Sequence, residues 1–445
     1  MEERTKHILQ KLGIEKLNEM QMMMGRYVQE GLSVMLLSPT GSGKTLAYLL
    51  PISENIDTTS DKLQAIVILP TRELAQQCHE VFSKLKTLCR TCCLHGGRPT
   101  MVEHARINEI KPHVIFSTPG RLKDHILKGN IEYKHLIKFL ILDEFDKCLE
   151  LGFQDEMCDI LGKINLVGQT ILVSATESDT IKGFVGNHLI QENIKELNFL
   201  YLNDELSSRV SVAFVKSERK DKLDTLLKLL TYIGACQTIV FVAHRESAIR
   251  VGDCLKKNGF HAEIYHGGLD QDLRERALFK FRNQTSNILI ATDLAARGLD
   301  IPEVGAIVHY HLPLKEEDYV HRNGRTARWD SEGKTFLIIG AEESQPKYIN
   351  SFEYIDVENI MVKPSVSMWS TIYIGKGKKD KLSKMDIVGF LCKKGNLDLK
   401  DIGRIDIAPY YSYVAVRRNK MLDALKNIKG QKIKGMKTIF EQLRT

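Results

Sequence analysis

The sequence predicts an α/β protein with two doubly wound parallel-sheet domains in tandem, followed by a small α+β domain. Short apolar runs rich in Val, Ile and Leu alternate with segments of helical length, and this alternation occurs twice. After about residue 345 the alternation lapses, and a shorter, strand-rich and basic segment completes the chain. Continuous apolar strands are typical of a parallel sheet that helices cover on both faces.

Each domain follows from its own set of apolar runs. The first domain is expected to span residues 1–206, with strands at 34–37, 65–69, 114–116, 139–142 and 170–173. The second is expected to span 207–345, with strands at 238–242, 262–265, 288–291 and 306–309. A linker punctuated by Pro346 and Pro364 is predicted at 346–367. The last domain, 368–445, has predicted strands at 370–374, 402–407, 412–417 and 437–440, and helices at 384–393 and 419–428.

Composition excludes several classes of protein. The chain has 445 residues, of which 43% are hydrophobic and 27% charged, as is usual for a globular protein. It has no apolar stretch long enough for a transmembrane helix, and its first residues are charged. Nine cysteines cannot all pair, so a reducing, cytoplasmic location is expected. Cys89, Cys92 and Cys93 form a cluster without a second ligand pair at zinc spacing, so we interpret them as reduced thiols.

The positive charge of the chain is concentrated in its last domain. Residues 368–445 contain 18 Lys and Arg against 7 Asp and Glu, so this segment carries +11. The whole chain carries +7, which leaves −4 for the rest. A basic segment attached to a nearly neutral body suggests contact with a polyanion, but a solvated lysine-rich surface explains the charge equally well.

A glycine-rich loop lies between the first predicted strand and a helix. Its residues are Ser38-Pro39-Thr40-Gly41-Ser42-Gly43-Lys44-Thr45. Glycines let backbone N–H groups approach phosphates, and the helix N-terminus adds positive potential. Thr40, Gly41, Ser42 and Gly43 are therefore expected around the phosphates of a nucleotide. Lys44 is expected to neutralise the β- and γ-phosphates, and Thr45 to hold Mg²⁺.

A second motif, the acidic Asp143-Glu144-Phe145-Asp146, follows a predicted strand about 100 residues after the glycine-rich loop. A carboxylate at such a strand end can hold Mg²⁺ beside the phosphate-binding loop, which is the role expected of Asp143. Glu144 is then expected to accept a proton from the attacking water.

Many further motifs occur in a fixed order. They are Pro70-Thr71-Arg72-Glu73-Leu74-Ala75-Gln76, Gly96-Gly97, Thr118-Pro119-Gly120-Arg121-Leu122, Ser174-Ala175-Thr176, the run from Ala291 to Asp300, and His321-Arg322-Asn323-Gly324-Arg325-Thr326-Ala327-Arg328. Together they resemble the DEAD-box RNA helicases over roughly residues 10–345. The resemblance implies two RecA-like domains that close over ATP, Mg²⁺ and RNA.

The resemblance also implies roles for single residues. Arg325 and Arg328 are similar to arginine fingers, which stabilise charge on the transferring phosphoryl group. His321 is similar to a residue that orients the attacking water. The remaining nucleotide and coupling positions are Gln21 for adenine, Asp300 for the ribose, and Ser174 and Thr176 for coupling hydrolysis to strand separation. The positions that match RNA backbone contacts are Thr71, Arg72, Gly97, Thr118, Arg121, Gln271, Arg274 and Thr292.

The last domain combines strands, two helices, a glycine–lysine loop and a group of tyrosines, which fits a small RRM-like fold that stacks bases on strand aromatics. It resembles the C-terminal domain of bacterial DbpA-type helicases, which docks on a structured hairpin of large-subunit ribosomal RNA. The alternative is a generic α/β tail with tyrosines in its core. The candidate RNA-binding residues are Lys376, Lys378, Lys379, Lys381, Tyr411, Tyr413 and Arg417.

The sequence as a whole predicts a monomeric, RNA-stimulated ATPase that locally unwinds RNA during assembly of the large ribosomal subunit. Two alternatives stay open. One is a general RNA helicase of stress or mRNA turnover, and the other is an RNA-binding assembly factor with a vestigial ATPase. The presence of Lys44, Glu144, Arg325 and Arg328 argues against the latter.

Overall fold

The computed structural model describes most of the chain as two compact units. Residues 8–10, 12, 14–39, 41–97, 99–164, 166–177, 183–184, 194–202, 209–293, 304–326 and 333–443 are described. The first unit comprises residues 1–208 with 298–300, and the second comprises 209–297 with 301–445. Among the described residues, every helix is too short or too polar to span a bilayer.

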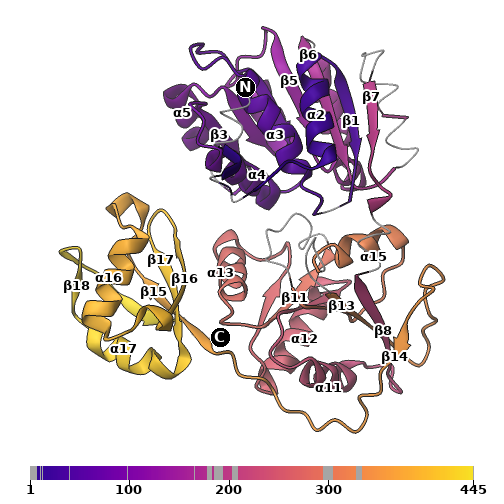
Figure 1. Ribbon diagram of the computed structural model, residues 1–445, viewed down its shortest axis with the longest axis vertical. Helices are drawn as coiled ribbons and strands as arrows, with labels where there is room; N and C mark the ends of the chain where they lie inside the picture. Colours follow the sequence, from indigo (N-terminus) through magenta and orange to yellow (C-terminus); the bar gives the residue numbers. More distant parts are fainter. Residues whose placement is uncertain are drawn as a thin grey trace. The chain divides into compact units, whose positions relative to one another are not determined.

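The first unit is a seven-stranded parallel sheet with helices on both faces (Figure 1). Its strand order is β3-β4-β2-β5-β6-β1-β7. The strands are β1 (Ser33–Leu37), β2 (Ala65–Ile68), β3 (Thr91–Leu94), β4 (Val114–Ser117), β5 (Ile137–Leu142), β6 (Val167–Ser174) and β7 (Ile194–Asn198). The helices are α2 (Glu19–Gln29), α3 (Lys44–Asn55), α4 (Arg72–Lys84), α5 (Thr100–Ile110), α6 (Pro119–Leu127), α7 (Phe145–Glu150) and α8 (Gln154–Lys163).

The second unit begins with a sheet of the same topology. Its order, β10-β11-β9-β12-β13-β8-β14, becomes that of the first sheet when each strand number is lowered by seven. The strands are β8 (Val210–Lys216), β9 (Thr238–Val242), β10 (Ala262–Tyr265), β11 (Ile288–Thr292), β12 (Ala306–His309), β13 (Gly333–Ile339) and β14 (Glu353–Tyr354). The helices are α11 (Leu223–Ile233), α12 (Arg245–Lys257), α13 (Gln271–Arg282) and α15 (Glu316–Asn323). The prediction of two doubly wound domains is therefore confirmed.

The segment predicted as a plain linker contributes a strand to the second sheet. Glu353 and Tyr354 of β14 pair with Ala213 and Phe214 of β8. The Phe352 and Tyr354 rings pack on Phe214, with centroids 4.8 and 6.1 Å away. Sequence alone missed this strand because two residues are too few to form a visible apolar run.

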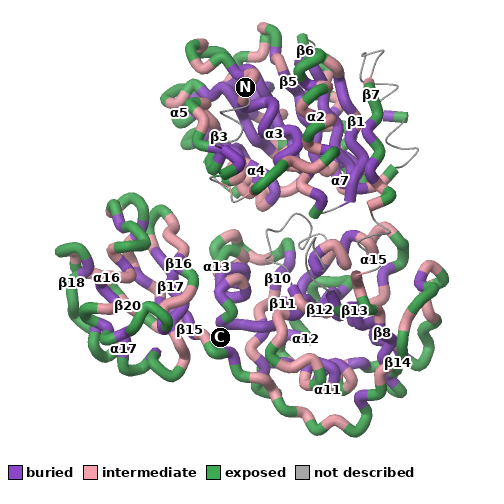
Figure 2. Tube along the Cα trace, in the orientation of Figure 1, coloured by how far each residue is buried: buried purple, intermediate pink, exposed green. Residues whose placement is uncertain are grey.

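The C-terminal domain is a four-stranded sheet of order β16-β17-β15-β20, in which every paired strand is antiparallel. Its elements are β15 (Trp369–Ile374), α16 (Lys384–Gly395), β16 (Ile402–Ile407), β17 (Ser412–Arg417), α17 (Met421–Ile428), the hairpin β18 (Lys432–Ile433) and β19 (Met436–Lys437), and β20 (Phe440–Gln442). Both helices pack on the sheet through a buried apolar core (Figure 2). The strand predicted at 437–440 is wrong in position, since residues 438 and 439 lie between the hairpin and β20.

Candidate ATP and RNA site

The glycine-rich loop joins β1 to α3, as predicted. Gly41 and Gly43 both have a φ of 88°, a left-handed backbone that a side chain disfavours. Lys44 begins α3, is 9% exposed and donates to the Ser38 carbonyl at 2.8 Å. Ser38 is fully buried and its hydroxyl donates to Ser42 Oγ at 2.7 Å, which explains why a serine fits here. The loop is thus held in shape by its own side chains.

Gln21 lies against this loop. Its amide nitrogen donates to the Gly43 carbonyl at 3.3 Å, and the neighbouring Asn18 donates to the Ser42 carbonyl at 3.1 Å. Asn18 and Gln21 also form a capping box at the start of α2. A β-carbon on Gly43 would lie 2.7 Å from the Gln21 amide nitrogen. The helix cap therefore fixes Gln21 beside the nucleotide loop, where its predicted contact with adenine stays a prediction.

Asp143 follows β5 and is 5% exposed. Its Oδ2 accepts from the Tyr48 hydroxyl at 2.7 Å, and its Oδ1 accepts from the Glu144 N–H at 2.9 Å. Burial raises the pKa of the Asp143 carboxyl, while Tyr48 and Lys44 oppose that rise. Burial also raises the pKa of Tyr48 well above its ordinary value, so the phenol stays protonated and donates.

The oxygen donors at this position fit Mg²⁺, which prefers hard oxygen ligands and usually completes its shell with substrate phosphates and water. A buried carboxylate gains from a nearby cation, because burial otherwise penalises its charge. Thr45 and Asp143 are the residues that would hold the ion.

Among the described residues no group of three or more His, Cys, Asp or Glu side chains could hold a metal. The cysteines of the predicted thiol cluster lie on or just before β3.

Glu144 adopts a left-handed backbone, with φ 48° and ψ 50°, at the start of α7. Non-glycine residues rarely take this conformation, and such strain is concentrated at functional positions. In the first turn of α7, Asp146 Oδ2 accepts at 3.1 Å from the hydroxyl of Thr176, which lies just after β6. The Ser174 hydroxyl in turn donates to the Thr176 carbonyl at 2.6 Å. Of the predicted coupling residues, Thr176 therefore contacts the acidic motif directly, and Ser174 contacts Thr176.

Three of the predicted RNA contacts of the first domain, Thr71, Arg72 and Gly97, lie near one another. Thr71 caps α4, and its hydroxyl accepts from the Leu74 N–H at 3.2 Å. The Arg72 guanidinium lies against the Gly96–Gly97 turn, since a β-carbon on Gly96 would lie 2.7 Å from Arg72 Nη2. Gly97 has a φ of 95°, so a side chain there would be strained. Two further predicted contacts, Thr118 and Arg121, lie at the start of α6.

In the second domain, α15 carries His321, which is 8% exposed, and Arg325 follows the helix at 6% exposed. Sequence reasoning missed the adjacent Arg322. Its guanidinium forms a two-pronged ion pair with Asp293, at 2.6 Å for Nε and 2.8 Å for Nη2. This pair ties α15 to the end of β11, directly after Thr292. The predicted Thr40, Asp300 and Arg328 lie outside the described residues.

The other predicted RNA contacts of the second domain, Gln271 and Arg274, lie in the first turn of α13. Further along the same helix, Phe279 packs on Tyr413 of the C-terminal domain with ring centroids 4.3 Å apart. Tyr411 donates to Glu275 at 3.4 Å. Tyr413 is 8% exposed, so stacking of this ring on a base requires the contact with Phe279 to open. The RNA-binding role of Tyr413 therefore stays a prediction, and it requires the Phe279 contact to open.

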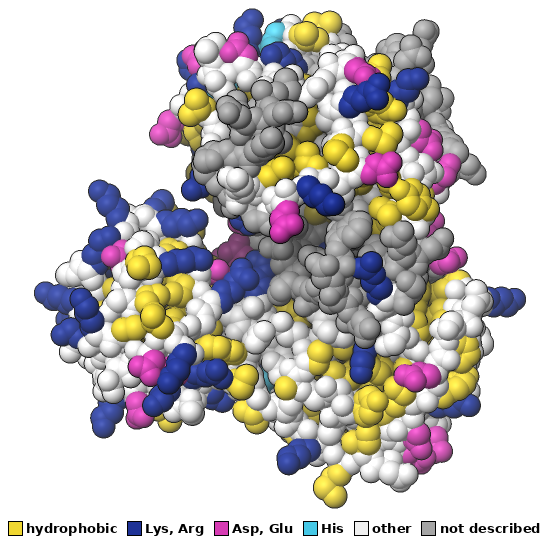
Figure 3. All heavy atoms as spheres, viewed as in Figure 1, with side chains coloured by type: hydrophobic (Ala, Val, Ile, Leu, Met, Phe, Trp, Pro, Cys, Tyr) yellow, Lys and Arg dark blue, Asp and Glu magenta, His cyan; other side chains and the backbone are white. Residues whose placement is uncertain are grey.

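The glycine–lysine loop follows β15 and is basic. An ion pair within the loop and a hydrogen bond from Lys434 hold part of it in place. Lys376 pairs with Asp380 at 2.8 Å, and the Lys434 ammonium donates to the Lys381 carbonyl at 2.8 Å. Lys378 and Lys379 are exposed, and the Lys379 ammonium lies 4.3 Å from the Tyr410 ring centroid. At the end of β17, Arg417 lies 4.8 Å from the centroid of the Trp369 ring. Lysine and arginine side chains are spread over the visible face of this domain (Figure 3).

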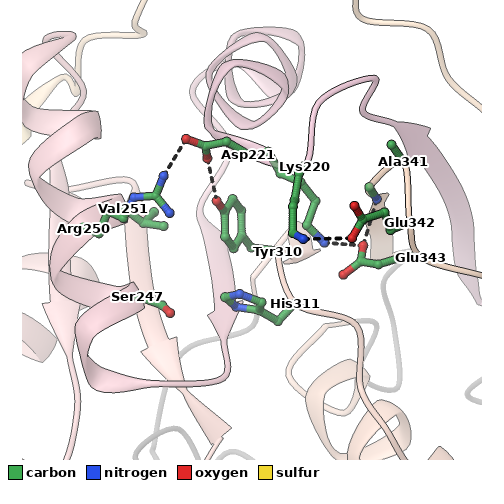
Figure 4. Close-up of a pocket in the computed structure, with 12 residues that line it drawn as sticks. Lys220, Asp221, Ser247, Arg250, Val251, Tyr310, His311, Ala341, Glu342 and Glu343 are labelled. Carbon is green, nitrogen blue, oxygen red and sulfur yellow. Dashed lines mark hydrogen bonds and ion pairs between the residues drawn. The ribbon is translucent and has the colours of Figure 1, made fainter.

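The second domain has a pocket of about 250 Å³ at the carboxyl ends of β8, β12 and β13 (Figure 4). These strands correspond to β1, β5 and β6, which surround the nucleotide loop in the first domain. The pocket's cations are paired with acids of the same pocket, at 2.9 Å or less: Lys220 with Glu342, Lys222 with Glu343, and Arg250 with Asp221. Ion pairs therefore take the position that the phosphate loop has in the first domain, and the pocket offers no surplus positive charge for phosphate.

Comparison with known proteins agrees with this geometry. Residues 18–184 match the DEAD/DEAH box helicase family, 218–330 the helicase conserved C-terminal domain, and 371–442 the DbpA RNA binding domain. The fold is similar to that of Mss116p bound to ssRNA and AMP-PNP, with a TM-score of 0.70 and 25% identity over 80% of this chain and 77% of that one. The chain is also 35% identical to ATP-dependent RNA helicase DBP3 of Kluyveromyces lactis, over 71% of this chain and 64% of that protein.

The fold, the nucleotide loop and these matches define the class: the chain belongs to the DEAD-box ATP-dependent RNA helicases, and it is an enzyme. Within that family it is similar, along nearly its whole length, to ATP-dependent RNA helicase DbpA of Escherichia coli. The two are 34% identical over 421 residues, which cover 91% of this chain and 90% of the relative. The resemblance predicted from the motifs is confirmed.

Proposed function

We propose that this helicase uses RNA-stimulated ATP hydrolysis to remodel ribosomal RNA during assembly of the large ribosomal subunit. The observation that carries the proposal is the combination of a complete helicase core with a basic C-terminal domain that matches the DbpA RNA binding domain. The core alone would act on RNA without preference, because its predicted contacts are to the sugar–phosphate backbone. A separate domain that recognises one hairpin would direct it to a target.

In the proposed mechanism, the N–H groups of the glycine-rich loop and Lys44 bind the ATP phosphates. Thr45 and Asp143 would hold Mg²⁺, which would supply neutralisation of the phosphate charge. Glu144 takes a proton from the attacking water, and His321 orients that water. Arg325 and Arg328 stabilise the charge that develops on the phosphoryl group, once RNA has brought the two domains together.

The C-terminal domain is proposed to bind a structured hairpin of ribosomal RNA. Its exposed Lys378 and Lys379 supply positive charge beside Tyr410, which is 63% exposed. Phosphate contacts with such lysines give affinity, and an exposed ring can stack on an unpaired base.

Crosslinking of the full-length protein to cellular RNA, followed by sequencing, tests this role. Enrichment at a single hairpin of large-subunit ribosomal RNA is the expected result. Reads spread over messenger RNAs would instead favour a general helicase of mRNA turnover and would refute the ribosomal role.

A further inference from the structure

A buried carboxylate lies behind the RNA-facing surface of the first domain. Glu103 is on α5, at the same edge of the sheet as β3 and α4 (Figure 1), and it is 3% exposed. Its Oε1 accepts from the backbone N–H of His95 at 3.3 Å. Its Oε2 lies 3.0 Å from His125 Nε2 and 3.5 Å from Arg121 Nε. A single side chain therefore contacts two separate segments of the chain, the residue before the Gly96–Gly97 turn and helix α6.

The hydrogen bonds around Glu103 are directional. The Asn130 amide nitrogen donates to His125 Nδ1 at 3.1 Å, and His125 Nε2 donates to Glu103. Arg121 Nη1 also donates to the Thr100 hydroxyl at 2.6 Å, and the Arg121 side chain is only 13% exposed. Glu103 and the Thr100 hydroxyl, both on α5, thus hold the Arg121 guanidinium.

Both segments that Glu103 contacts lie at predicted RNA contacts, Arg121 and Gly97. Arg121 belongs to the start of α6, and His95 directly precedes the Gly96–Gly97 turn. An arginine side chain has about 2 kcal/mol of rotamer entropy to lose when it is fixed on a ligand. A contact that is already oriented loses less on binding, so a support of this kind raises affinity without touching the ligand.

We propose that Glu103 is a positioning residue for RNA: it orients Arg121 and the turn at Gly97 so that both meet the sugar–phosphate backbone of one strand. This rests on the proposed RNA contacts of those two residues. Glu103 itself contacts neither RNA nor ATP, and the rate of ATP hydrolysis without RNA does not depend on it.

The test is a double-mutant cycle in the full-length protein, with Glu103→Gln, Arg121→Ala and the pair together. Binding of a labelled single-stranded oligouridine is measured at several salt concentrations with a non-hydrolysable ATP analogue. Arg121→Ala is expected to weaken binding about tenfold and to flatten the slope of log affinity against log salt by about 0.7, the value for one lost phosphate contact. Glu103→Gln is expected to lower the affinity and flatten the salt slope nearly as much as Arg121→Ala. The double variant is expected to bind oligouridine no more weakly than Arg121→Ala alone.

Glu343→Gln is the matched control. Glu343 also accepts from a buried cation, Lys222, and from a backbone N–H, that of Gly340, but it lies in the second domain. Its removal should leave oligouridine binding and its salt slope unchanged. Equal losses in Glu343→Gln and Glu103→Gln would show a general effect of losing a buried acid and would overturn the proposal.

Other outcomes are equally decisive. Wild-type binding by Glu103→Gln, or losses that multiply in the double variant, would show that Glu103 does not act through Arg121. If Arg121→Ala itself bound normally, the proposed RNA contact of Arg121 would be wrong instead. Melting temperatures identify any variant that fails to fold. In that case Glu103→Asp, which keeps the charge but shortens the side chain, must reproduce the loss of affinity or the proposal fails.

Discussion

Single residues of the nucleotide site are held by partners far away in the sequence. Asp143 is paired with Tyr48, 95 residues earlier, and Tyr48 also contacts Cys78 of α4 at 3.1 Å. The motif predicted Asp143 because its position at a strand end could be recognised from neighbouring residues. No local pattern indicated Tyr48, Arg322 or Glu103, since their partners are brought close only by the folded sheet.

The strained residue Glu144 gives the first prediction. Glu144→Gln keeps the side-chain shape and removes the proposed base. Nucleotide binding should survive, while RNA-stimulated hydrolysis should fall by about 10² or more, the usual scale for a positioned base. Steady-state ATPase assays with saturating RNA, together with ADP titration, measure both quantities. An unchanged turnover number would remove Glu144 from the mechanism.

Tyr48 gives the second prediction. Tyr48→Phe removes the hydrogen bond to Asp143 and should lower the free energy of unfolding by about 1–3 kcal/mol, because a buried acceptor is left without its donor. Asp143 should also become less well oriented, so more Mg²⁺ should be needed for half-maximal ADP binding. Calorimetric titration of ADP at several Mg²⁺ concentrations measures this shift.

Tyr310→Phe is the control for that experiment. Tyr310 follows β12, the counterpart of β5, and its hydroxyl donates to Asp221 in the second domain at 3.5 Å. This variant should leave the Mg²⁺ requirement as it is. A shift in Tyr310→Phe, or none in Tyr48→Phe, would contradict the positioning of Asp143 by Tyr48.

Among the secondary-structure elements, the sequence analysis found most strands that form uninterrupted apolar runs, and it missed β3, β7, β8, β13 and β14. The central strands β2, β5, β9 and β12 are almost wholly buried and appear as continuous apolar runs. Of these missed strands, β3, β7 and β14 are sheet edges, whereas β8 and β13 lie inside the second sheet. Only part of β7 is buried, and its sequence alternates with polar residues. In contrast, β8 and β13 contain apolar runs, at 212–215 and 336–339, that were overlooked.

The junction of β1 with α3 depends on a glycine that has no room for a side chain. Gly43→Ala would combine a φ of 88° with a β-carbon 2.7 Å from the Gln21 amide nitrogen. We expect a loss of about 1–2 kcal/mol of stability from the backbone, and a loss of nucleotide affinity because the loop or Gln21 must move. Gly129→Ala is a matched control, since its φ is also positive, 68°, but nothing lies within 4 Å. It should cost similar stability and leave nucleotide affinity intact, and a loss of affinity there would refute the steric argument.

For the whole molecule, hydrolysis is proposed to require both domains, because the phosphate loop and the proposed arginine fingers, Arg325 and Arg328, belong to different ones. ATPase activity should therefore be weak without RNA and strongly stimulated with it. Arg328→Ala should abolish the stimulation with little change in nucleotide affinity, since a finger acts mainly in the transition state. Rates measured with and without RNA decide this, and equal rates in the unaltered protein would exclude a mechanism of closure by RNA.

Target choice by the whole molecule is proposed to depend on the loop of the C-terminal domain rather than on net charge alone. Lys378→Ala combined with Lys379→Ala should weaken binding of the ribosomal hairpin and flatten its salt dependence, by up to about 0.9 per lost phosphate contact. Lys426→Ala with Lys429→Ala removes the same charge from exposed positions at and just beyond the end of α17. The control pair should retain the preference for the hairpin over an unrelated duplex. If both pairs lost it equally, general charge would explain the binding. If neither did, the ribosomal RNA would be recognised elsewhere on the protein, and the loop would have no part in targeting.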